Sequence, residues 1–150
     1  MNDATSPPPA PADPDLAPDF TALLTQSVHM AGDILHKFNT FFPFGVAMTP
    51  AGQLERVNAY DGEERPPIRE MLDTLARAFA VGLRGSRYRA TALCMNVRCP
   101  GQDGTTEIDA LRAHLVHRCG HELHFFVPYT RTTDGYIFAR PFTRAVDAMR

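Results

Sequence analysis

The sequence predicts an α+β domain in which two amphipathic helices pack against an antiparallel sheet of five or six strands. Three observations support this fold class. Residues 20–38 and 68–83 repeat apolar side chains at intervals of three and four, as helices with one buried face do. Residues 41–60 have the pattern of a β-hairpin. Residues 87–139 hold three or four further apolar segments separated by turn residues, which completes an order of helix, two strands, helix and strands.

The start of the chain differs in composition from the rest. The first 18 residues hold six of the 13 prolines, few large apolar side chains and no basic residue. Such a segment cannot bury enough apolar surface to offset its loss of conformational entropy on folding. We therefore expect residues 1–18 to form a disordered, proline-rich arm and residues 19–150 to form a single domain, which is long enough for one hydrophobic core.

Charge and composition exclude several classes of function. The formal net charge of −2, from 15 basic and 17 acidic residues, argues against a nucleic-acid-binding surface. No window approaches the roughly 20 apolar residues that would span a bilayer, so we expect no membrane role. The three cysteines are an odd number and the start of the chain does not resemble a signal peptide. These features favour a cytoplasmic location with reduced thiols.

The hairpin is the most densely specified part of the chain. Its first strand alternates large side chains with small ones, so one face should pack on the helices; the large positions are Phe42, Phe44, Val46 and Met48. Gly45 lies inside this strand, where a glycine weakens a sheet unless another group packs closely over it. After a turn at residues 49–52, we expect the return strand at residues 53–60.

The remaining elements follow from helix signals and strand patterns. Asp19 is placed to cap the first helix, and the second helix should begin after Pro66 and Pro67 and end at Gly85. The patterns predict a buried central strand at residues 87–99, strands at 107–118, 122–129 and 136–139, and a terminal helical turn at 142–150.

This order of elements resembles that of the profilin-like and roadblock-type domains, in which a helix leads into a hairpin, a second helix crosses and a three-strand meander completes the sheet. The likeness is one of topology and spans residues 19–142. The strings Phe42-Pro43-Phe44-Gly45 and Tyr60-Asp61-Gly62-Glu63, followed by Ala92-Leu93-Cys94, are also similar to a family of small uncharacterised bacterial proteins. Because no activity is known for that family, the resemblance implies no catalytic residue.

No motif in the sequence fixes a reaction. The chain has neither a serine in a nucleophile-elbow context nor a glycine-rich phosphate loop. Four histidines and Cys119 fall within 11 residues, but their spacing matches no zinc pattern, and strand parity places His114 and His117 on opposite faces. We therefore expect solvated surface histidines, a buried and inert Cys94, no metal and no cofactor.

The sequence favours a binding site over an active site. The candidate binding residues are Phe44, Tyr60, Asp61, Glu63, Glu64, Arg65 and Met71. The three acidic residues could bind a cation or a basic partner, although a favourable interaction with the following helix dipole also explains them.

Our leading hypothesis is a non-catalytic interaction module of adaptor, chaperone or immunity type, which binds an unknown protein and forms a homodimer to cover its sheet edges. The alternative is a small-ligand sensor with a pocket between the hairpin and the second helix, lined by Phe44, Tyr60 and Met71. An enzyme is the least favoured of the three possibilities.

Overall fold

The computed structural model describes residues 14–60, 62 and 64–144. Its elements are α1 (Leu16–Phe38), β1 (Phe44–Met48), β2 (Leu54–Val57), α2 (Ile68–Arg84), β3 (Ala90–Pro100), β4 (Glu107–His117), β5 (Glu122–Thr132), β6 (Gly135–Phe138) and β7 (Phe142–Arg144). The strands form a seven-stranded antiparallel sheet in the order β2-β1-β3-β4-β5-β6, and β7 pairs with the first half of β5. The predicted α+β class and the order of helices and strands are confirmed.

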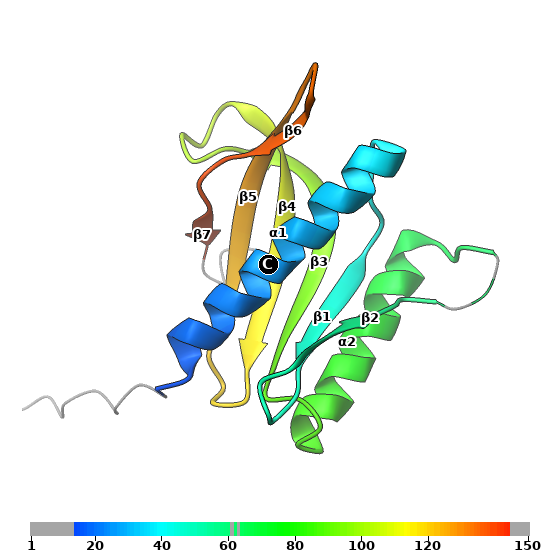
Figure 1. Ribbon diagram of the computed structural model, residues 1–150, viewed down its shortest axis with the longest axis vertical. Helices are drawn as coiled ribbons and strands as arrows, with labels where there is room; N and C mark the ends of the chain where they lie inside the picture. The colour runs from blue at the N-terminus through cyan, green and yellow to red at the C-terminus, as the bar shows by residue number, and fades with distance from the viewer. Residues whose placement is uncertain (1–13, 61, 63, 145–150) are drawn as a thin grey trace, which may run out of the picture.

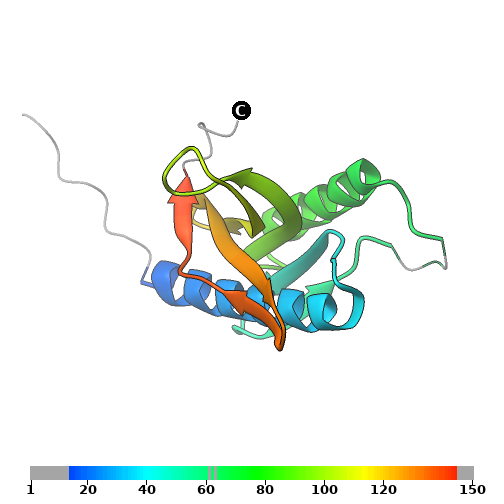
Figure 2. The same ribbon diagram turned by 90° about the horizontal axis from the view of Figure 1, so that it is seen from above.

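The two helices lie on opposite faces of the sheet, so the domain has three layers (Figures 1 and 2). α1 packs on the face that contains Phe44, Val46 and Met48. α2 packs on the other face, where the small residues Gly45 and Ala47 lie. The expectation that the large face of the hairpin meets both helices was therefore wrong: each face of β1 has its own helix.

The small face of β1 allows α2 to approach the sheet closely. A Cβ atom at Gly45 would overlap the ring of Phe79 on α2. A Cβ atom at Gly82 on α2 would in turn overlap the ring of Tyr88, which packs edge-on against Phe79 with ring centroids 6.1 Å apart. Both glycines are therefore needed for space, because an aromatic ring occupies the volume that a side chain would fill.

A buried carboxylate attaches the start of α1 to the sheet. Asp19 lies in the first turn of α1, which begins at Leu16, so it is not the predicted cap. Its Oδ1 atom accepts a hydrogen bond from Nη2 of Arg89 at 2.7 Å, and its Oδ2 atom accepts from Nε of Arg89 at 3.0 Å. Nε2 of His117 lies 2.9 Å from the same Oδ2 atom. We refer to these three residues as the Asp19 clamp.

The histidine of the clamp is satisfied in its neutral form. Nδ1 of His117 accepts a hydrogen bond from the backbone N–H of Cys119 at 3.3 Å, so the ring hydrogen lies on Nε2 and points at Asp19. Burial by itself would raise the pKa of the Asp19 carboxyl. The hydrogen bonds and positive charge of Arg89 and the hydrogen bond from His117 outweigh this effect, so the pKa of Asp19 is lowered.

Several element ends differ from the predictions. Leu16, Ala17 and Pro18 belong to α1 rather than to the arm, because a proline is tolerated in the first helical turn, where its missing N–H has no helical partner. β2 ends at Val57, three residues before the predicted end at residue 60. Residues 142–144 form a strand instead of a helical turn, since Phe142 pairs with Phe126 and stacks on its ring.

We predict that Gly45→Ala destabilises the domain by about 1–3 kcal/mol, because the added methyl group forces Phe79 out of its position. Gly62→Ala is the matched control: a Cβ atom at Gly62 would meet no atom within 4 Å, so the change should cost less than about 0.5 kcal/mol. Urea unfolding of both variants beside the wild type measures the difference. Equal unfolding midpoints for the two variants would refute the close packing of α2.

We predict that Asp19→Ala costs about 3–5 kcal/mol, because it removes a buried carboxylate that accepts from Nε and Nη2 of Arg89 and pairs with Nε2 of His117. Asp15→Ala, which removes an ion pair with Arg118 that is about half exposed, should cost less than about 1 kcal/mol. Because the pKa of Asp19 is lowered on folding, its stabilisation is complete above the unfolded pKa of about 3.9 and is lost as the pH falls through the lower folded value.

The stability gap between wild type and Asp19→Ala should therefore shrink in acid. Urea unfolding at about pH 7 and about pH 3 tests this expectation. A gap that is the same at both values, or that widens in acid, would contradict the clamp.

Candidate functional site

A half-open cavity of about 720 Å³ lies where β2 ends and the chain leaves the sheet. One wall is the last part of α1, and the others are the start of β1 and the loop that leads from β2 towards α2. Because β2 stops at Val57, which pairs with Gly45, Phe44 at the start of β1 has β3 on one side and no strand on the other. Side chains from three separate segments line the space on that open side.

The floor of the cavity is apolar and buried. Phe44 from β1 is 2 % exposed and Met71 from α2 is 1 % exposed, and Met30 and Ala59 lie with them among the buried lining residues. Polar side chains line the walls: Asp33 and Lys37 from α1, Arg56 from β2, and Asn58 after it. Lys37 and Arg56 form no ion pair with any residue that the structure describes.

The mouth of the cavity carries exposed aromatic rings. Phe38 is 68 % exposed, and Phe42 and Tyr60 are each 38 % exposed. We call these three side chains the aromatic rim. The guanidinium of Arg65 lies 3.7 Å from the centroid of the Phe42 ring, a cation–π contact that covers one face of it. Phe38 was expected in the buried stripe of the first helix, but it is exposed at the end of α1.

The residues expected at the site divide into three groups. Phe44, Tyr60 and Met71 line the cavity, although α1 as well as α2 borders it. Glu64 and Arg65 are exposed in the loop before α2 and do not line the cavity. Arg65 contacts the ring of Phe42, which does line it. Asp61 and Glu63 lie outside the residues that the structure describes.

The sequence reasoning missed the contribution of α1. Met30, Ile34 and Phe38 are spaced by four residues and form a second apolar row beside the core stripe, and Asp33 and Lys37 have the same spacing. Side chains four apart lie above one another on a helix. The apolar surface at the end of α1 is therefore wider than one core stripe needs. This excess width is the sequence signal that could have indicated a binding surface.

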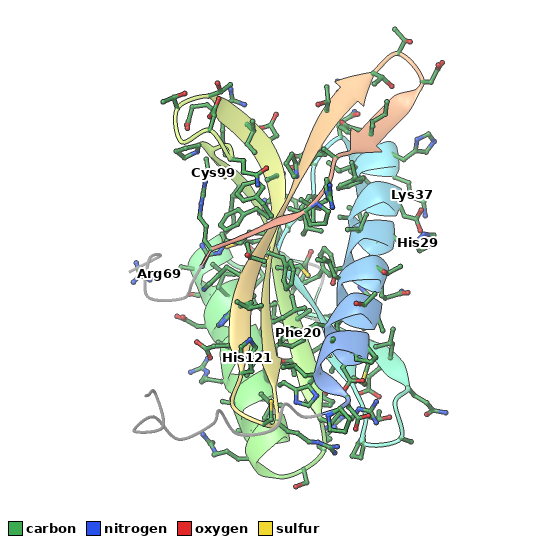
Figure 3. All side chains as sticks on the ribbon, turned by 90° about the vertical axis from the view of Figure 1, so that its left-hand side faces the viewer. Phe20, His29, Lys37, Arg69, Cys99 and His121 are labelled. Carbon is green, nitrogen blue, oxygen red and sulfur yellow. The ribbon has the colours of Figure 1, made fainter. Side chains whose placement is uncertain are left out.

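The histidines and cysteines do not form a metal site in the described part of the chain. No three His, Cys, Asp or Glu side chains among residues 14–60, 62 and 64–144 come together as metal ligands would. Cys99 lies towards one end of the sheet and His121 beside Phe20 towards the other (Figure 3). Burial raises the pKa of the Cys94 thiol to about 12, which makes it a poor nucleophile.

Two histidines are buried, contrary to the expectation of a solvated face. His117 is 1 % exposed and His124 is 3 % exposed. His117 belongs to the Asp19 clamp, and His124 accepts a hydrogen bond at Nδ1 from Nε of Arg112 at 3.2 Å. Polar partners within the fold therefore replace the water that the sequence pattern suggested.

Comparison with family models, with curated proteins and with solved structures finds no match. Neither helix in the described residues has the length and apolar character needed to cross a membrane.

Proposed function

We propose that this protein is a protein-interaction module that binds an extended segment of a partner across the aromatic rim and along β2. The exposed rim carries the proposal. A small molecule in the cavity would cover the floor, whereas the outward-facing parts of Phe38, Phe42 and Tyr60 are covered only by a partner that lies over the mouth. Aromatic residues and arginine are the side chains most enriched at the energetic centres of protein interfaces.

The backbone of β2 supports an extended segment as the form of the partner. Among the residues that the structure describes, β2 is the outermost strand on its side of the sheet and pairs only with β1. The backbone N–H of Thr49 donates to the carbonyl of Gln53 at 2.8 Å, and hydrogen-bonded pairs alternate along an antiparallel ladder. By this alternation, the backbone groups of Leu54 and Arg56 point away from β1 and are available to an added strand.

The charges on β2 disfavour two of the registers in which a second copy of this chain could pair with it. In a twofold antiparallel pairing, residues on the same face of the sheet oppose each other. A register centred on Glu55 sets this carboxylate against its own copy, and a register centred on Arg56 does the same with two guanidinium groups. Like charges in directly opposed positions are destabilising. The homodimer expected from the sequence remains a prediction.

A small-ligand sensor is the second candidate. The cavity volume of about 720 Å³ falls in the ordinary range for small-ligand sites, about 300–1,000 Å³. Its apolar floor and the two cations on its walls, Lys37 and Arg56, suit an amphipathic anion.

A peptide-display selection on the immobilised protein, followed by anisotropy measurements on the enriched peptides, tests the proposal. We expect Phe38→Ala and Tyr60→Ala to weaken peptide binding about tenfold or more. Phe38→Ala should change stability by less than about 0.5 kcal/mol, because the Phe38 side chain is 68 % exposed. The matched control is Val81→Ala: Val81 is also exposed, at 61 %, and lies on α2. It is ten residues, or about 15 Å of helix, from Met71.

Equal peptide affinity in all three variants would refute the rim as the binding surface. If no peptide is enriched and a metabolite raises the melting temperature of the wild type but not of Tyr60→Ala, the sensor is the correct function.

A further inference from the structure

The face of the sheet that carries α2 also has a second, smaller groove. α2 covers β1 and β3, and beside it β4 and β5 present Arg112, His114 and His124. A groove of about 310 Å³ separates these strands from α2, and its lining is apolar except for Asp73, Arg112 and His114. This groove is on the opposite face from α1, and no residue lines both it and the cavity described above.

Arg112 is a half-buried cation without an acidic partner in the described part of the chain. Its one hydrogen bond there runs from Nε to His124, so its two terminal amino groups donate to no described residue. Burial lowers the pKa of the Arg112 guanidinium, and the nearby Cys99 thiol offsets part of this effect. Partial burial of a charge without an opposite charge beside it is unfavourable, so no ion pair among the described residues accounts for Arg112 at this position.

His124 fixes the orientation of the guanidinium. Because Nδ1 of His124 accepts from Arg112, the neutral ring carries its hydrogen on Nε2. The His124 ring stacks on that of His114, its cross-strand neighbour, with centroids 4.4 Å apart and planes 8° apart. Stacking on His114 fixes the plane of the His124 ring, and the hydrogen bond from Arg112 to this ring fixes the position of Nε. The free end of the guanidinium is then a prearranged fork of N–H donors.

We propose that this groove binds a small monocarboxylate with an apolar body. The two terminal amino groups of Arg112 donate to the two carboxylate oxygens, a geometry that arginine provides and lysine does not. The apolar part of the ligand lies on Leu93 and Met95, which line the groove.

The acidic groups around the groove restrict the ligand to a single negative charge. Asp73 lines the groove from α2, and Glu122 lies 3.7 Å from Nε2 of His114. Neither carboxylate pairs with Arg112, and both repel further negative charge. Arg144, another cation on this face, donates to the backbone carbonyls of Pro100 and Gly101. A phosphate or a dicarboxylate is therefore disfavoured.

NMR titration of the full chain with 4-methylpentanoate tests the site, with the Nε–H signal of Arg112 as the readout. We expect a saturable shift of this signal at millimolar probe, and no such shift with inorganic phosphate. Arg112→Lys should weaken binding of the probe by about tenfold or more. Arg98→Lys is the matched control, because Arg98 is an exposed arginine on β3 paired with Asp109, and it should bind the probe as the wild type does.

The melting temperature of each variant shows that it is folded, and Arg112→Lys should melt within a few degrees of the wild type. A large loss of stability in that variant would mean that Arg112 serves the fold and would overturn the proposal. The absence of a saturable shift, equal probe binding by Arg112→Lys, or tighter binding of phosphate would also overturn it. None of these outcomes bears on peptide binding at the aromatic rim, which lies elsewhere.

Discussion

The carboxylate of Asp19 decides where α1 lies. Arg89 precedes the first residue of β3 and His117 is the last residue of β4, and these two strand ends are neighbours in the sheet, where Ala90 pairs with His117. Asp19 binds both, so the first turn of α1 is held at one end of the sheet. The helix then runs along the sheet, and its last turns form a wall of the cavity (Figure 1). A paired buried ion contributes little net stability but fixes a geometry, since its partners tolerate few other arrangements.

The two helices are attached by different physical means. α1 combines an ionic anchor at its start with a broad apolar stripe that packs on large side chains of the sheet. α2 has no such anchor among the described contacts and packs by close approach over Gly45, with its own Gly82 against Tyr88. Van der Waals contact at short range positions α2, whereas an ion pair positions the start of α1.

Local periodicity was sufficient to predict the helices, the hairpin and most strands, because those patterns depend on residues within a few positions of each other. It also indicated Phe44, Tyr60 and Met71 as lining residues, because the hairpin and α2 that carry them follow one another in the chain. The Asp19 clamp could not be predicted in this way, since its partners are 70 and 98 residues further along the chain. The opposite placement of the helices had a sequence signal that went unused: the small residues at Gly45 and Ala47 left room for a second layer.

The two sides of the sheet are built differently, and this has a consequence for assembly. β5 is paired along most of its length, first with β7 and then with β6, and these outer strands span three and four residues with Pro141 before β7. Short edge strands interrupted by a proline resist further pairing. β2 is also only four residues long, but no proline directly precedes or follows it. In the proposed complex, the partner strand extends the sheet on the β2 side. Such a complex would hold one partner strand per chain, and further chains would not lengthen this sheet.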